Sequence, residues 1–163
     1  MTRIGLISDT HSYIEPKLFE FLETVDEIWH AGDLGGIDIA DRLKKLKPLR
    51  AVYGNIDDQK VRTEYPENNR FQCEETEVWM THIGGYPGKY DRKIREKIKQ
   101  NPPDLFISGH SHILKVQYDK QLELLHINPG AIGRNGFHQV KTAVRFSIDG
   151  KNIKDLEIFE LPR

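Results

Sequence analysis

The sequence predicts an α/β protein of one domain, in which helices flank two β-sheets. Three observations lead to this fold class. In the first 55 residues, short apolar runs alternate with stretches of helical periodicity, which is typical of strand–helix–strand units. Residues 71–80 alternate between apolar and polar side chains, as a hairpin does. Beyond residue 105 the chain is nearly continuous strand.

The first part of the chain predicts a largely parallel sheet. We expect strands at 4–7, 27–30 and 49–53, one helix that opens at Pro16 and reaches Val25, and a second helix with Ile39, Ala40, Leu43 and Leu46 on one face. Pro48 ends the second helix. Strand–helix–strand units connect parallel strands through right-handed crossovers, so these three strands are predicted neighbours.

The second part of the chain makes the topology mixed. We expect a loop with at most one helical turn at 57–70, a hairpin at 71–80, a helix at 90–100, and strands at 105–108, 113–118, 122–127, 142–148 and 153–161. Asp149-Gly150 is typical of a tight hairpin turn. The glycine-rich segment 84–88 is interpreted either as a mobile substrate lid or as an ordinary connection.

Composition limits the classes of function. The 163 residues suit a single domain, and a formal net charge of −1 with 37% hydrophobic residues indicates neither bulk nucleic-acid binding nor an acidic tail. Cys73 is the only cysteine, so an internal disulfide and a cysteine-based zinc site are excluded. No apolar stretch suits a signal peptide or a membrane span, and we expect a soluble cytoplasmic protein.

Side chains of metal-ligand type follow five of the predicted strands. They are Asp9 and His11, then Asp33, Asn55 and His82, and finally His110 and His112. Taken singly, an aspartate or asparagine beside glycine is often only a turn residue. Because strands of one sheet bring their carboxyl ends together, the whole series predicts a metal site at that edge. Asp57 is interpreted as a turn residue or as a support for this site, and His30 as a core histidine.

The series resembles the calcineurin-like metallophosphoesterases, and the short chain is similar to their small prokaryotic phosphodiesterase branch. Its motifs are Asp9-x-His11, Gly32-Asp33, Gly54-Asn55-x-Asp57, His82 and Gly109-His110-x-His112, and the resemblance extends to the Asn128-Pro-Gly130 turn and the closing strands. It implies a four-layer α/β/β/α sandwich with two mixed β-sheets, the metallo-dependent phosphatase-like fold. Residues 1–163 would form one metallophosphoesterase domain.

The resemblance also implies two divalent transition-metal ions. The first metal would be held by Asp9, His11, Asp33 and His112, and the second by Asp33, Asn55, His82 and His110, with Asp33 as the bridge. Mixed nitrogen and oxygen donors suit Mn²⁺, Zn²⁺, Ni²⁺, Fe or Co²⁺ better than Ca²⁺ or Mg²⁺, and we favour Mn²⁺.

These features together predict a metal-dependent phosphodiesterase. It would hydrolyse a small phosphodiester or phosphomonoester with a hydroxide activated by the two metals, so no side-chain nucleophile is required and no further catalytic residue is assigned. Asn55 and Arg134 are predicted to contact the substrate. Ile56 stands where many relatives carry a histidine acid, and this predicts a preference for good leaving groups such as aryl esters.

Two other hypotheses remain open at this point. The same fold serves as a non-catalytic protein-binding scaffold in a retromer subunit related to this family. Alternatively, the metal serves folding alone, which predicts closed four-coordinate shells. We also expect homo-oligomers through apolar residues on the edge strands, while His126 and His138 are assigned no role.

Overall fold

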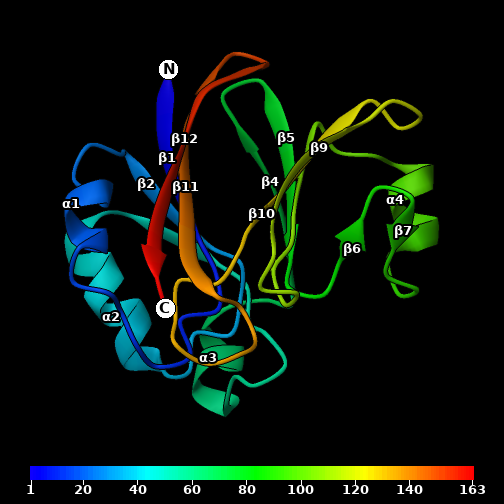
Figure 1. Cartoon of the computed structure of the whole chain (residues 1–163). Coiled ribbons are helices and arrows are strands. Elements are labelled where there is room, and N and C mark those ends of the chain that lie inside the picture. Colours follow the sequence, from blue (N-terminus) through cyan, green and yellow to red (C-terminus); the bar gives the residue numbers. More distant parts are fainter.

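The computed structural model describes residues 1–163 and contains two five-stranded sheets that face each other (Figure 1). The first sheet has the order β12-β11-β1-β2-β3, formed by Asn152–Pro162, Val140–Asp149, Thr2–Ile7, Glu27–His30 and Leu49–Ala51. The second has the order β4-β5-β8-β10-β9, formed by Asn68–Cys73, Thr76–Thr81, Leu105–Ile107, Leu124–Pro129 and Leu114–Asp119. Each sheet mixes parallel and antiparallel pairs, as predicted.

Helices cover the outer faces of both sheets, so the predicted α/β/β/α layering is confirmed. The four helices are α1 (Leu18–Leu22), α2 (Ile37–Leu46), α3 (Gln59–Glu64) and α4 (Arg95–Gln100). In Figure 1, α1 and α2 lie against the first sheet and α4 lies beyond the second sheet. None of these helices combines the length and the apolar character that a membrane crossing requires.

Three apolar clusters separate these layers. Ile7 and Leu43 belong to the cluster between the first sheet and its helices. Ile4 and Met80 belong to the cluster between the two sheets, where Trp29 also lies. The third cluster packs Ile98 of α4 against the second sheet. Successive side chains of a strand point to opposite faces, so the short β1 contributes Ile7 to the first cluster and Ile4 to the second.

The predicted parallel unit is present in the first sheet. β1 pairs with β2 in parallel, with Ile7 opposite His30, and β2 pairs with β3 in parallel. The other edge of β1 pairs antiparallel with β11, where Thr2 lies opposite Ile148. The hairpin predicted at Asp149 joins β11 to β12, and the hairpin predicted at 71–80 is β4–β5.

Several predicted boundaries were wrong. The glycine-rich segment 84–88 contains unexpected secondary structure, because β6 (Gly85–Tyr86) and β7 (Lys89–Tyr90) form a small hairpin there. The helix expected from residue 90 begins only at Arg95, since Tyr90 pairs in β7 and Asp91 starts a turn by accepting a hydrogen bond from the Lys93 amide (3.0 Å).

The polar 57–70 segment holds more structure than the sequence indicated. It contains the six-residue helix α3 and the start of β4 at residue 68. Asp58 begins the helix, because its carboxylate accepts a hydrogen bond from the Val61 amide (3.2 Å). β4 begins with polar residues, and the side chain of the first, Asn68, accepts a hydrogen bond from the Trp79 indole on the neighbouring strand (3.1 Å). By contrast, the first helix is shorter than expected and ends at residue 22 rather than Val25.

The edge strands of both sheets carry exposed apolar side chains. Val116 and Tyr118 are exposed on β9, and Ile158 is exposed on β12. An edge strand offers unpaired backbone groups to another chain. Association between copies of the chain therefore stays a prediction, now attached to these two strands.

Candidate metal centre

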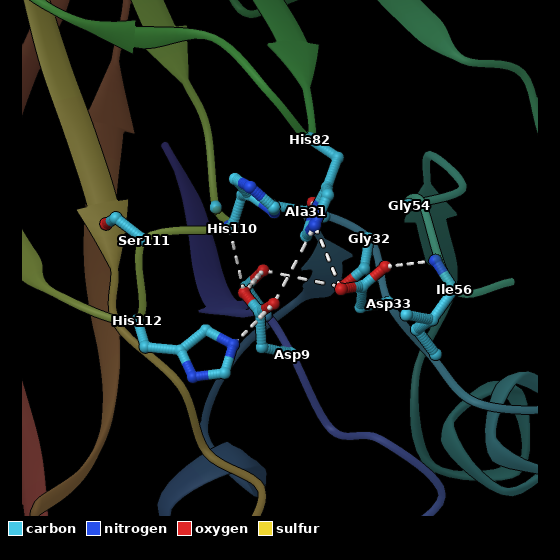
Figure 2. A network of polar contacts seen from close by, with 12 residues as sticks. Asp9, Ala31, Gly32, Asp33, Gly54, Ile56, His82, His110, Ser111 and His112 are labelled. Atoms are coloured by element: carbon cyan, nitrogen blue, oxygen red, sulfur yellow. Dashed lines mark hydrogen bonds and ion pairs between the residues drawn. The ribbon is translucent and has the colours of Figure 1, made fainter. Parts of the chain in front are cut away.

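All seven predicted ligand residues lie beyond the carboxyl ends of five strands. Asp9 and His11 follow β1, Asp33 follows β2, Asn55 follows β3, His82 follows β5, and His110 and His112 follow β8. The first three strands belong to one sheet and the last two to the other. The loops therefore meet where the two facing sheets end, and in Figure 2 the labelled histidines point toward Asp9 and Asp33.

Six of these side chains form two groups that are suited to hold a cation. One group contains Asp9, His11 and His112, and the other contains Asp33, His82 and His110, with the ligand atoms of each group within 4.8 Å of one another. Asp33 touches both groups, because its Oδ2 lies 3.4 Å from His11 Nε2 and 3.1 Å from His82 Nε2. One carboxylate oxygen is thus positioned between the two groups.

Asn55 and Arg134 are placed differently from these six residues. Asn55 is exposed in the turn after β3, and it lines a cleft together with His82. The next amide in the chain, that of Ile56, donates a hydrogen bond to Asp33 Oδ1 (3.1 Å), which ties this turn to the site. The guanidinium of Arg134 stacks 3.8 Å from the ring of Tyr13, and its contact with a substrate stays a prediction.

The backbone of the site is held in an unusual conformation. Asp9, His11, Asp33, His110 and His112 have φ values of 55°, 46°, 59°, 70° and 64°. This left-handed region is uncommon for residues other than glycine and costs free energy. Such strain persists only where surrounding contacts fix the backbone, and it is common at functional sites.

Hydrogen bonds between loops supply that fixation. The amide of Asp9 donates to the Gly32 carbonyl and the amide of His11 donates to the Asp33 carbonyl, both at 3.0 Å. The His110 amide donates to Asp9 Oδ2 (3.2 Å). A side chain at Gly32 would have no room, because its Cβ would lie 2.6 Å from His82 Nδ1.

Asp57 joins two of the site loops, as the sequence indicated for a supporting residue. Its buried carboxylate accepts hydrogen bonds from the amides of Leu34 (3.2 Å), Gly35 (2.9 Å) and Gly54 (2.8 Å). The first two amides follow Asp33 directly, and the third precedes Asn55. A single carboxylate therefore sets the spacing between the loop after β2 and the turn after β3.

Three buried donor atoms of this cluster have no hydrogen-bond partner. Asp9 Oδ1, His11 Nε2 and His82 Nε2 are buried and form no hydrogen bond of acceptable geometry. Buried polar atoms almost always find a hydrogen-bond partner, so three exceptions in one cluster require an explanation. A cation coordinated by these atoms provides one, and imidazole with carboxylate is a donor set that transition metals accept.

The electrostatics of the cluster favour a cation. Burial raises the pKa of a carboxyl, but His11 and His112 outweigh this effect and hold the pKa of Asp9 well below its ordinary value. Burial alone would also raise the pKa of Asp33, but His11 and His82 lower it below its ordinary value. In return the carboxylates of Asp33 and Asp9 raise the pKa of His11 to about 9. The negative potential that retains this proton also attracts a divalent ion.

Two of the histidines are oriented by acceptors on the far side of the ring. His82 Nδ1 lies 2.7 Å from the Ala31 carbonyl, so we assign the proton to Nδ1 and the free lone pair to Nε2. His112 Nδ1 lies 3.1 Å from His138 Nδ1, and His138 Nε2 lies 2.8 Å from the Gly133 carbonyl. The carbonyl can only accept, so His138 donates from Nε2 and accepts at Nδ1 from His112.

His138 is the contributor that sequence reasoning missed. It lies 26 residues from His112, in the loop that connects β10 to β11, and no motif marks it. Gly136 allows the His138 loop to approach His112, since a Cβ atom at position 136 would lie 2.2 Å from His112 Nδ1.

The remaining two histidines, His30 and His126, are fully buried. His30 accepts a hydrogen bond from the Gly32 amide (3.1 Å) and lies 3.1 Å from Thr10 Oγ1, so it braces both site loops from the core. Burial lowers the pKa of His30 and of His126 to about 4, and both rings are uncharged at neutral pH.

Comparison with known proteins identifies the family. The sequence matches the calcineurin-like phosphoesterase superfamily domain over residues 2–151. The chain belongs to this superfamily. A "Probable metallophosphoesterase" of Methanothermobacter thermautotrophicus is 34% identical over 134 residues, which cover 78% of this chain and 76% of that protein. Membership implies a phosphoester hydrolase that uses divalent metal ions.

Solved structures share the fold of this superfamily member. A protein described as a novel archaeal phosphodiesterase has a TM-score of 0.74 and 21% identity, with 98% of this chain and 99% of that chain covered. Vps29 of Entamoeba histolytica, described as complexed with zinc, has a TM-score of 0.75 and 17% identity, with 98% of each chain covered. At these identities the likeness concerns the fold.

Proposed function

We propose that the protein is a phosphodiesterase with a dinuclear metal centre. The observation that carries this proposal is the position of Asp33, one oxygen of which lies within 3.4 Å of a histidine from each ligand group. We assign Asp9, His11, Asp33 and His112 to one ion, and Asp33, Asn55, His82 and His110 to the other. Mn²⁺ is the favoured ion, and Zn²⁺, Ni²⁺, Fe and Co²⁺ suit the same donors.

The protein's own contribution is to hold the donors and shape the opening. Bound divalent ions lower the pKa of coordinated water and neutralise charge on phosphoryl oxygens. Asp9 is fully buried and Asp33 nearly so, whereas His110 and Asn55 are exposed. The buried carboxylates of Asp9 and Asp33 therefore hold the centre on its protein-facing side. The exposed Asn55 amide and His110 imidazole lie on the solvent side, from which a phosphate ester approaches.

The test is hydrolysis of bis(p-nitrophenyl) phosphate by protein stripped of metal and refilled with Mn²⁺, Zn²⁺ or Ni²⁺. We expect activity that depends on metal, and a rate that falls steeply as the leaving group becomes more basic, because Ile56 cannot donate a proton. Failure of every metal to support turnover, with metal bound, would contradict the proposal. That result would favour the protein-binding scaffold hypothesis, which the Vps29-like fold also fits.

A second prediction concerns His138 as a positioning residue for a ligand. In the assigned hydrogen-bond chain, His138 fixes the proton of His112 on Nδ1 and so leaves Nε2 to bind a metal. Removing such an outer partner typically weakens metal binding by about 10–100-fold. We expect this loss in His138→Ala, measured by competition with a chelator.

The control for this prediction is the conservative variant His138→Asn. Its amide oxygen can replace Nδ1 as the acceptor for His112, so we expect most of the metal affinity to return. Thermal unfolding of both variants under chelator separates a loss of fold from a loss of ligand orientation. Equal metal affinity in wild type and His138→Ala would contradict the assigned role.

A further inference from the structure

A cleft beside the metal centre gathers positive charge that the proposed chemistry does not use. It has a volume of about 540 Å³, and its lining includes His110 on one side and the β6–β7 hairpin on the other. Four cationic side chains line it, Lys89, Arg92, Arg95 and Lys115, against the single carboxylate of Asp91. The volume falls within the range of small-molecule sites, about 300–1,000 Å³.

These four cations are not neutralised within the protein. None of them takes part in an ion pair, although Arg50, Arg70 and Arg145 elsewhere on the sheets each pair with a glutamate. Lys115 instead lies 4.0 Å from the ring centre of Tyr86, which holds the ammonium at the cleft wall and leaves its charge in place. The whole chain has a formal net charge of −1, so this concentration is local.

The cleft continues into the metal centre. Besides His110, it is lined by Gly109 and Ser111 of the same ligand loop. A second cleft of about 690 Å³ touches the centre from Asn55 and His82, and the two clefts share Ile83 and Asp91. A phosphodiester has two substituents, and a centre flanked by two clefts offers space for one on each side.

We infer that the cationic cleft binds a second phosphate group, carried by one substituent of the phosphodiester substrate. This inference rests on the proposed phosphodiesterase function and narrows the substrate to esters with a further phosphate, such as phosphorylated nucleotides or the phosphorylated end of a short nucleic acid. Lysine and arginine side chains are the usual partners of phosphate dianions. The scissile group then lies beside His110 while the second phosphate lies among the cations.

Two chromogenic esters with the same scissile group test this inference. They are thymidine 5′-(p-nitrophenyl phosphate) and its 3′-phosphorylated analogue, which differ only by one phosphate dianion. We expect kcat/KM to be about tenfold higher for the phosphorylated ester at low salt, and the preference to shrink as ionic strength rises. Equal kcat/KM values for the two esters at low salt would overturn the inference.

Variants show whether the cleft causes the preference. Arg92→Ala combined with Arg95→Ala is expected to bring the ratio of the two kcat/KM values close to one. Arg42→Ala combined with Lys45→Ala removes two exposed cations from α2 and is expected to leave the ratio unchanged. A preference that survives in the cleft variant would place the second phosphate elsewhere and overturn the assignment.

Binding separates this inference from the proposed function. If no ester is hydrolysed, the phosphodiesterase proposal fails, but calorimetric titration with thymidine 3′,5′-bisphosphate still tests the cleft. Wild type must bind this probe at least about tenfold more tightly than the Arg92/Arg95 variant, and equal binding overturns the inference. Titration with a 5′-phosphorylated oligonucleotide distinguishes the source, because tighter binding than the bisphosphate indicates a nucleic-acid end.

Discussion

Asp33→Asn is expected to lower kcat/KM for bis(p-nitrophenyl) phosphate by about 10³-fold or more and to reduce the number of metal ions bound. The amide can keep the hydrogen bond that Oδ1 accepts from the Ile56 amide (3.1 Å). In this orientation it replaces Oδ2, which lies 3.4 Å from His11 Nε2 and 3.1 Å from His82 Nε2, with an uncharged NH2 group that cannot bind a metal. The change therefore affects the proposed shared ligand while disturbing the local backbone little.

Metal content by elemental analysis and turnover measured on the same samples check this result. Asp38→Asn is the matched control, since it makes the same chemical change on an exposed carboxylate in the first turn of α2. The control should retain wild-type metal content and rate. Full activity in Asp33→Asn would show that the two ligand groups do not share this carboxylate.

The second large effect is expected on stability. Asp57→Ala should lower the free energy of unfolding by about 3–5 kcal/mol, because three amide donors lose a charged acceptor and two of them are buried. Asp57→Asn keeps one acceptor oxygen and should lose less. Urea unfolding in the presence of a chelator measures this effect without any contribution from metal binding.

The neighbouring residue provides the control for this prediction. Asp58→Ala removes only the cap of α3, where one carboxylate oxygen accepts from the Val61 amide, and should cost about 1 kcal/mol. If both alanine variants lost the same small amount, the three hydrogen bonds of Asp57 would not carry the connection between the loops.

The layers and the positions of the candidate ligands at the strand ends could be predicted from the sequence for a common physical reason. A short apolar run predicts a buried strand, and the polar residue after it is placed at the strand's carboxyl end without knowledge of the rest. This local argument located Asp9, Asp33 and His82 beyond β1, β2 and β5. The supporting role predicted for Asp57 was found in the same way, from its place in the turn after β3.

Features that arise from packing between distant segments could not be predicted from the sequence. His138 reaches His112 across 26 residues, because a glycine lets its loop approach the site. The cationic cleft is lined by both the β6–β7 hairpin and the loop after β8, whereas the sequence indicated a glycine-rich segment that was either a mobile substrate lid or an ordinary connection. The periodicity around residues 92–95 indicates a helix, but it does not tell which other segment lies opposite Arg92 and Arg95.

The pairing of β1 with β11 has a consequence for the order in which the protein folds. β1 leads directly into Asp9, yet its antiparallel partner lies at the far end of the chain, with Thr2 opposite Ile148. Contacts between residues so far apart in sequence form slowly, because a long loop must close first. During synthesis on the ribosome, one edge of β1 stays unpaired until the β11–β12 hairpin has emerged. The loop that carries Asp9 is therefore expected to reach its final position only after β11 has been synthesised, which is later than the synthesis of His112, the last candidate ligand in the sequence.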